Sequence, residues 1–169
     1  ENVDVYGWEA AILGMRNPLN SRAKSDSYGA DNRYVIGPAD HDLMMRLSKA
    51  GTAHSKYRRF ITVTVDITAP LYWWKEADTY KVGTVANSCS TMHKIHAKPI
   101  EVSDFSVEHL TPASMAEFEK FVAYIESVRL QYVETKDKAH WIDMIQLLPS
   151  SYNQMRTVTL NYEVLASMY

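Results

Sequence analysis

The stretch HSKYRRFITVTVDITAPLYWWKEADTYKVGTVANSCSTM, residues 54–92, decides the fold of this chain. Within it, residues 60–67 alternate in polarity and are rich in β-branched side chains, which predicts a strand. Pro70 can occupy the first position of a helix, where the hydrogen bond that it cannot make is not needed. We therefore expect a helix from Pro70 to about Val82, followed by a polar connection over residues 86–103.

The composition is that of a globular protein with a sizeable core. The 169 residues are 46% hydrophobic and 22% charged, which predicts a single domain over residues 1–169. The net charge of -2 gives no overall attraction to nucleic acid or to an anionic membrane, so neither is an expected partner. Cys89 is the single cysteine, and no apolar run approaches the roughly 20 residues of a membrane span. Residues 1–4 lack a signal-peptide pattern, so we expect a cytoplasmic protein.

The rest of the chain mixes strands and helices without regular alternation, which is typical of the α+β class. Thr111 and Pro112 are residue types preferred at the cap and first position of a helix, so the longest helix is expected to begin there. A final helix from Tyr162 has about two turns, which is marginal, so we expect the natural chain to continue past Tyr169. The other expected elements are a strand from Val3 to Met15, a loop from Asn20 to Asn32, a helix capped by Asp40 and ending at Gly51, a helix from Lys138 to Leu147, a strand from Tyr152 to Leu160, and Asn161 as the cap of the last helix.

The expected helix from Pro70 to Val82 permits two interpretations. Its aromatic side chains offer stacking area, and its Lys and Tyr side chains can donate to a phosphate or a carbonyl, which would make it the wall of a ligand site. Glu76 and Tyr80 are four residues apart and would share one face. The alternative, favoured by periodicity alone, is an amphipathic helix with Trp in the core and its charges in solvent.

Cys89, His93 and His96 form a C-x3-H-x2-H spacing. A zinc site needs three or four converging ligands, and no second Cys or His pair follows at finger spacing, so we expect no metal. A second hypothesis is that Cys89 is a nucleophile with His93 as its base. A small metal-dependent hydrolase that uses Cys89, His93 and His96 is the third class of function that the chain allows. The plain alternative is a loop that carries two histidines.

Other ligand signals are sparse. The sequence has no G-x-G-x-x-G, Walker or G-x-S-x-G motif, so dinucleotide binding of the Rossmann kind is not expected. His54 stands near Lys56, Arg58 and Arg59, just before the expected strand, and such a basic patch can hold phosphate. The local pattern by itself favours a solvated strand entrance.

Three stretches, read together from about His54 onward, resemble the flavin-dependent thymidylate synthase family. A histidine, a strand and an Ala-Pro helix start are common to both. The family's Gln falls on Glu76, its Arg-His-Arg on Thr79-Tyr80-Lys81, and its Ser-x-Arg near Ser88–Thr91. Its Leu-Pro falls on Leu148-Pro149, and its later Thr-x-Asn falls on Thr159-Leu160-Asn161. Between Pro149 and Asn161 the family's spacing is kept without a gap.

The resemblance implies an α+β fold with an antiparallel sheet, a long helix and shorter helices, assembled as a homotetramer. It implies FAD at subunit interfaces, dUMP stacked beside the flavin, methylene-tetrahydrofolate as the carbon donor, and NADPH as the reductant of the flavin. Catalytic residues are left unassigned. By position, the implied flavin contacts are His54, Thr79, Tyr80, Lys81 and Asn161, and the implied contacts to the nucleotide base and phosphate are Glu76, Ser88 and Ser90.

The chain departs from the family where the ligands carry negative charge. Lys81 keeps one cation of the Arg-His-Arg, and two further family arginines fall on Ile145 and Glu163. Each lost bidentate pair removes roughly 1.5–3 kcal/mol of phosphate binding. Two functions follow: FAD-dependent methylation of dUMP, or a non-catalytic homologue that binds a nucleotide or a partner. The cations available to replace the lost arginines are Lys56, Arg58, Arg59 and Arg156.

Overall fold

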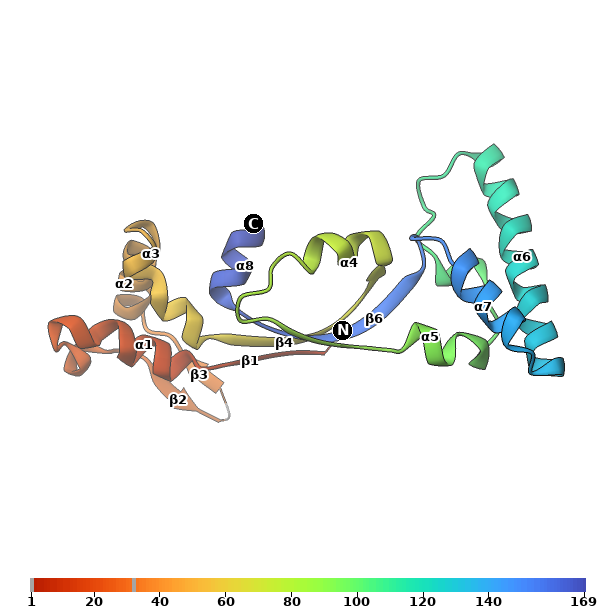
Figure 1. Ribbon diagram of the computed structural model, residues 1–169. Coiled ribbons are helices and arrows are strands. Elements are labelled where there is room, and N and C mark those ends of the chain that lie inside the picture. Colours follow the sequence, from red (N-terminus) through yellow and green to blue (C-terminus); the bar gives the residue numbers. More distant parts are fainter. Residues whose placement is uncertain (1, 32) are drawn as a thin grey trace. The chain divides into compact units, whose positions relative to one another are not determined.

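The computed structural model describes residues 2–31 and 33–169 of the chain (Figure 1). The chain forms two compact units. Unit 1 contains residues 1–66, 80–86 and 157–169, and unit 2 contains residues 67–79 and 87–156. The expectation of a single domain over residues 1–169 stays a prediction.

Helices and strands are mixed along the chain, as the α+β class requires. The strands are β1 (Val3–Tyr6), β2 (Tyr28–Ala30), β3 (Arg33–Val35), β4 (Thr62–Pro70), β5 (Val85–Ser88) and β6 (Asn153–Asn161). The α-helices are α1 (Trp8–Arg16), α2 (Pro38–Lys49), α3 (Thr52–Ser55), α4 (Leu71–Ala77), α5 (Thr91–Lys94), α6 (Pro112–Thr135), α7 (Lys138–Leu147) and α8 (Tyr162–Met168). Short 3-10 turns are η1 (Asn17–Leu19), η2 (Arg22–Lys24), η3 (Lys56–Phe60), η4 (Ile95–Ala97) and η5 (Val102–Asp104).

The strands form a four-stranded sheet in the order β1-β4-β6-β5 and a two-stranded sheet of β2 and β3. Strand β1 pairs antiparallel with β4, from Val3 opposite Val65 to Tyr6 opposite Thr62. Strands β2 and β3 also pair antiparallel. The predicted α+β class with an antiparallel sheet, one long helix and shorter helices is therefore confirmed.

The first segment of unit 1 differs from its prediction. The strand expected from Val3 to Met15 ends at Tyr6, and helix α1 begins at Trp8. Gly7 separates the two elements with a φ of 89°, a left-handed conformation that glycine adopts without steric cost. Helix α1 then buries an apolar stripe against α2 and η3; the core residues of this cluster are Ala11, Ile12, Met15, Met44, Tyr57 and Ile61.

Asp40 was expected to cap helix α2, but it does not. The helix begins at Pro38, and Asp40 lies in its first turn with a fully buried side chain. Its carboxylate accepts a hydrogen bond from Arg16 of helix α1 and several from the segment of Ser25 to Ser27. These contacts order part of the region that the sequence suggests is a loop, which also contains η2 and β2; Asn32 lies outside the described residues.

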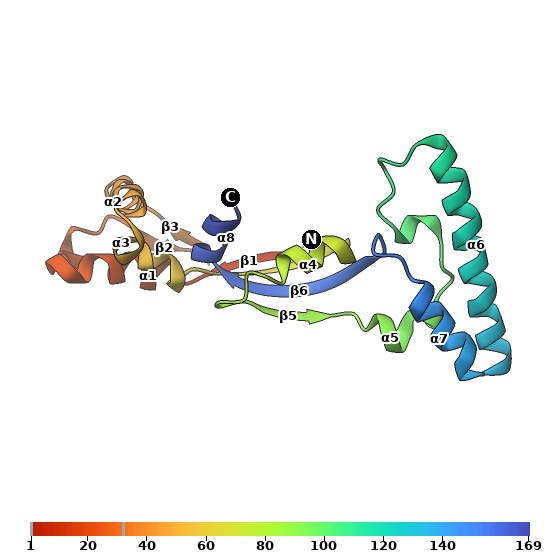
Figure 2. The same ribbon diagram turned by 45° about the horizontal axis from the view of Figure 1, so that its top comes forward.

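Unit 2 is built on the long helix α6. The predicted start of this helix is confirmed, because the side chain of Thr111 caps it and Pro112 is its first residue. Helix α7 has the predicted bounds and lies beside α6 in both views (Figures 1 and 2). Together with the segment from Ile95 to Phe105 they enclose a core. Its buried residues are Ile95, Ile100, Phe105, Val122, Ile125, Val128 and Met144.

The decisive stretch, residues 54–92, is divided differently from the expectation. Turn η3 occupies residues 56–60, so β4 starts at Thr62 and continues to Pro70. Helix α4 ends at Ala77 rather than Val82, which leaves Thr79, Tyr80 and Lys81 beyond its last turn. The expected polar connection over residues 86–103 contains β5, α5, η4 and η5.

The predicted cap of the last helix is confirmed. Strand β6 ends at Asn161, whose side chain accepts a hydrogen bond of 3.0 Å from the Val164 N–H at the start of helix α8. Among the described residues, no helix combines the length and the apolar character that crossing a membrane requires.

Candidate functional site

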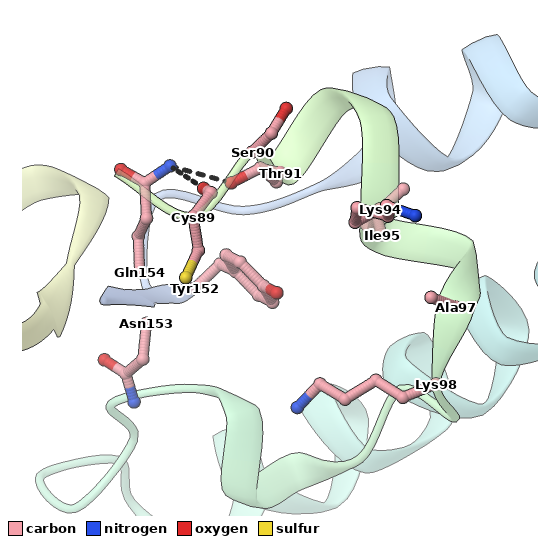
Figure 3. A pocket seen from close by; sticks show the side chains of 10 residues that line it. All are labelled: Cys89, Ser90, Thr91, Lys94, Ile95, Ala97, Lys98, Tyr152, Asn153 and Gln154. Atoms are coloured by element: carbon pink, nitrogen blue, oxygen red, sulfur yellow. Dashed lines mark hydrogen bonds between the residues drawn. The ribbon is translucent and has the colours of Figure 1, made fainter. Parts of the chain in front are cut away.

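Unit 2 contains a pocket of about 340 Å³ (Figure 3). It lies where the end of β5, helix α5 and turn η4 meet the start of β6. Hydroxyl, thiol, amide and ammonium groups line it together with apolar side chains. The lining residues are Cys89, Ser90, Thr91, Lys94, Ile95, Ala97, Lys98, Tyr152, Asn153 and Gln154.

Gln154 fixes one rim of this pocket. Its amide nitrogen donates to the Cys89 carbonyl at 3.1 Å and to the Thr91 hydroxyl at 2.9 Å, as the dashed lines in Figure 3 mark. The Cys89 N–H donates in turn to the Met155 carbonyl at 3.0 Å. The rim that carries Ser90 is thereby held against β6 by three hydrogen bonds.

Arg156 positions Gln154, and its charge is already paired with an acidic side chain. Its Nε donates to the Gln154 side-chain oxygen at 2.9 Å, and its Nη1 contacts the Asp78 carboxylate at 2.9 Å. Its guanidinium also lies 4.3 Å from the ring centroid of Trp74. The sequence suggested Arg156 as a replacement for a lost arginine, but these contacts commit its charge within unit 2.

Lys98 and Tyr152 face each other across the pocket. Asp104 accepts a hydrogen bond from Lys98, and this bond raises the pKa of the Lys98 ammonium, so Lys98 stays charged. Burial raises the pKa of the Tyr152 phenol, and the Asp104 carboxylate raises it further, so Tyr152 stays protonated. Figure 3 shows the Tyr152 hydroxyl reaching into the space between Cys89 and Lys98.

The residues predicted to contact a nucleotide are all in unit 2, and one of them lines the pocket. Ser90 caps helix α5, where its hydroxyl accepts from the His93 N–H at 3.2 Å, and it lies on the pocket rim. Ser88 ends β5 and is exposed. Glu76 is exposed on helix α4, and its backbone carbonyl accepts a hydrogen bond from the Thr79 hydroxyl.

The residues predicted to contact flavin are divided between the units. Thr79 belongs to unit 2, whereas His54, Tyr80, Lys81 and Asn161 belong to unit 1. His54 is exposed on the short helix α3, which precedes turn η3 and strand β4. Lys81 is exposed, and Tyr80 is half-buried.

Gly83 brings the segment after Lys81 against Asn161. It has a φ of 76°, and a Cβ atom added there would lie 2.6 Å from the Asn161 side-chain nitrogen. The same asparagine caps helix α8 through its side-chain oxygen. Asn161 is thus adjacent, within unit 1, to the segment that follows Tyr80 and Lys81, and all three are predicted flavin contacts.

We predict that Gly83→Ala destabilises unit 1 by about 1–2 kcal/mol, because alanine resists a positive φ and its Cβ would displace the Asn161 cap. Chemical denaturation measures the change. Gly29→Ala is the matched control, since a Cβ there meets nothing within 4 Å. Equal stability of the two variants would contradict the close approach of Gly83 to Asn161.

The basic patch near His54 is only partly available. Arg58 donates to the Ser48 carbonyl at 3.3 Å and lies 3.7 Å from Glu163, the residue at a family arginine position. Lys56 and Arg59 are exposed, and neither has an ion-pair partner in the described part of the chain. Two of the four suggested replacement cations therefore face solvent.

The Cys89, His93 and His96 spacing finds no support in the geometry. Across residues 2–31 and 33–169, no group of three His, Cys, Asp or Glu side chains is placed to hold a metal ion. The His96 ring instead packs edge-on against Tyr132, with centroids 5.0 Å apart, and its carbonyl accepts a hydrogen bond from Arg129.

Sequence reasoning did not find Lys94, Lys98, Tyr152 or Gln154, which the structure brings to the pocket. Lys94 and Lys98 lie in what was treated as a polar connection, and Tyr152 and Gln154 lie at the start of an expected strand. The available signal was the position of Tyr152 shortly after Leu148-Pro149, a motif shared with the family. Lys98 and Tyr152 are more than 50 residues apart, and a local sequence pattern does not reveal that such distant residues share a pocket.

Comparison with solved structures places this geometry in a known fold. Thymidylate Synthase X (ThyX) from Helicobacter pylori, crystallised with FAD and dUMP, is 16% identical with a TM-score of 0.71, over 99% of this chain and 81% of that chain. A second structure of that protein, also with FAD and dUMP, is 15% identical with a TM-score of 0.66, over 99% and 82%. The UMP/dUMP methylase PolB from Streptomyces cacaoi, bound with 5-Br UMP, is 10% identical with a TM-score of 0.58, over 98% and 74%.

No protein-family model and no curated protein matches the sequence. Likeness at such low identity establishes architecture, because a fold tolerates replacement of nearly all of its residues while a site does not. The chain has the fold of the flavin-dependent thymidylate synthases.

Proposed function

We propose that this chain binds FAD and a uridine nucleotide and methylates dUMP, with methylene-tetrahydrofolate as carbon donor and NADPH as reductant. The observation that carries the proposal is the likeness over 99% of the chain to a ThyX crystallised with FAD and dUMP. The pocket in unit 2 supports it, because Ser90, which the family resemblance assigns to the nucleotide, lies on its rim.

The nucleotide site is proposed to include Glu76, Ser88 and Ser90. The Ser90 segment is held to β6 by hydrogen bonds from Gln154, so its hydroxyl is presented by a fixed backbone. A fixed donor loses little entropy when it binds a ligand, which favours recognition of a small polar molecule. The exposed Ser88, at the end of β5, adds a second hydroxyl close by in the chain.

The flavin site is proposed to use His54, Thr79, Tyr80, Lys81 and Asn161. The donor set of unit 1 fits a group with a pyrophosphate, because His54 and Lys81 are exposed and Lys56 and Arg59 carry charges that no acidic side chain of the described residues neutralises. When bound, FAD supplies the hydride for reduction of the methylene group. We further propose a homotetramer, in which neighbouring subunits complete each flavin site.

The alternative is a non-catalytic homologue that keeps the fold and binds a nucleotide or a partner. Specific observations favour it: Ile145 and Glu163 occupy two arginine positions of the family, and Glu163 is turned toward Arg58. Thr79-Tyr80-Lys81 replaces Arg-His-Arg. A carboxylate in place of a guanidinium repels a phosphate instead of binding it.

We predict that the purified full chain takes up FAD and releases tritium from 5-tritiated dUMP when methylene-tetrahydrofolate and NADPH are present. FAD titration, followed by the flavin absorbance, measures the first step separately from turnover. Flavin binding without tritium release would favour the non-catalytic homologue. A colourless protein that gains no flavin on titration would contradict both the cofactor and the reaction.

A further inference from the structure

Tyr152 presents to the pocket a hydrogen-bond donor that none of the described residues accepts. Its ring is fixed edge-on against Phe105, with centroids 5.6 Å apart, and its backbone bonds with Pro149 and Leu71 at 3.0 Å each. Its hydroxyl has no partner within the part of the chain that the structure describes, and it points into the pocket (Figure 3). A rigid side chain with an unused hydrogen-bond donor can bind a ligand with little loss of conformational entropy.

Lys98 supplies a second donor that points into the same space (Figure 3). An ammonium has three N–H groups, and the bond to Asp104 uses one of them while holding the side chain in place. Two N–H groups therefore remain for a ligand. Ile95 and Ala97 add apolar wall between these polar groups.

Lys94 and Lys98 both line the pocket, but the charges that act on the Tyr152 phenol itself do not favour an anion there. Asp104 neutralises Lys98, and the Asp104 carboxylate raises the pKa of the Tyr152 phenol against a smaller opposite effect of Lys98. A phosphate placed at this phenol would meet the Asp104 charge without a full counter-charge. A neutral ring with carbonyl oxygens would accept from both donors and cost no charge burial.

We propose that the pocket lined by Tyr152 and Lys98 binds the planar lactam ring of a substrate, with its carbonyl oxygens accepting hydrogen bonds from the Tyr152 hydroxyl and the Lys98 ammonium. This assignment rests on the proposed function, because the uracil of dUMP and the pterin of methylene-tetrahydrofolate both carry such a ring. The pocket volume of about 340 Å³ lies at the lower end of the range for small-molecule sites, which suits one ring system.

NMR titration of the full chain with deoxyuridine, deoxycytidine, tetrahydrofolate and inorganic phosphate tests the proposal. We expect deoxyuridine or tetrahydrofolate to bind, and the one that binds more tightly identifies the source of the ring. If deoxyuridine is the ligand, deoxycytidine should bind at least about fivefold more weakly, because an amino donor replaces one of its carbonyl acceptors.

Tyr152→Phe is expected to weaken binding of that ligand by about fivefold, the loss of one neutral hydrogen bond. Tyr124→Phe is the matched control, since Tyr124 is an exposed tyrosine on helix α6 of the same unit, and it should leave the affinity unchanged. Unchanged affinity in Tyr152→Phe, preferential binding of inorganic phosphate, or no binding of either ring compound would overturn the assignment.

The outcome is separable from that of the proposed function. Ring binding that depends on Tyr152 in a protein that takes up no FAD would sustain the pocket and reject the enzyme. Tritium release from dUMP with the same KM for dUMP and for tetrahydrofolate in Tyr152→Phe would sustain the enzyme and reject the pocket assignment.

Discussion

Replacing Asp40 by alanine is expected to destabilise unit 1 by about 3–5 kcal/mol, the cost of leaving a buried charge without its partner. Arg16 and Asp40 are both buried, at 6% and 0% exposure, and they are joined through Arg16 Nε. The other carboxylate oxygen accepts from the hydroxyls of Ser25 and Ser27 and from two backbone N–H groups. Urea denaturation followed by circular dichroism measures the loss.

Asp42→Ala is the matched control for this prediction. Asp42 lies on the same helix and also pairs with an arginine, Arg46, but both side chains are about two-thirds exposed, at 67% and 69%. Exposed pairs of this kind contribute roughly 0–1 kcal/mol. A similar small loss for both variants would show that the Arg16–Asp40 pair is not the anchor of unit 1.

The same carboxylate makes the stability of unit 1 depend on pH. Burial alone raises the pKa of Asp40, but hydrogen bonds from Ser25, Ser27 and Arg16 outweigh it and lower the pKa from 3.8 to about 2. Because the folded pKa lies below the unfolded one, the stabilisation is fully present above about pH 4 and is lost as the pH falls toward 2. It amounts to about 2 kcal/mol, and Asp40→Ala should unfold with a correspondingly weaker dependence on pH in this window.

Trp74→Ala is the second change with a large expected effect, a loss of about 3–5 kcal/mol in unit 2. Trp74 is 3% exposed, and its indole N–H donates to the Gln154 carbonyl at 3.0 Å. Its ring face also supports Arg156, which in turn orients the Gln154 amide. Chemical denaturation measures the change in stability of the full chain.

Trp73→Ala is the neighbouring control, because Trp73 is 41% exposed and touches Trp74 only edge-on at 4.9 Å. We expect it to cost no more than about 1.5 kcal/mol. Since Gln154 holds the pocket rim, Trp74→Phe should also weaken ring binding while Trp73→Ala should not. A larger loss from Trp73 than from Trp74 would mean that helix α4 packs on its other face.

Elements with local signals were predicted well from the sequence. Thr111 and Pro112 begin helix α6, helix α7 has the expected bounds, and Asn161 caps helix α8. Each of these rests on hydrogen bonds between residues at most a few positions apart, so local sequence contains the whole cause.

Elements whose bounds depend on distant partners were predicted less well. Asp40 has the residue type of a helix cap, but Arg16 and the Ser25–Ser27 segment take its carboxylate. Helix α4 ends at Ala77 although its periodicity continues to Val82, and Asp78, the next residue, pairs with the distant Arg156. Competition between local and distant partners cannot be resolved from spacing alone.

For the stretch of residues 54–92, the sequence by itself determined a strand, a proline-led helix start and, through its resemblance, the fold that the solved structures share. Only the tertiary structure decided the site: it committed Arg156 to Asp78 and Gln154, and it placed Tyr152 and Lys98 around one pocket. The reason is physical. A helix or strand is selected by neighbours along the chain, whereas a pocket is made by side chains that only packing brings together.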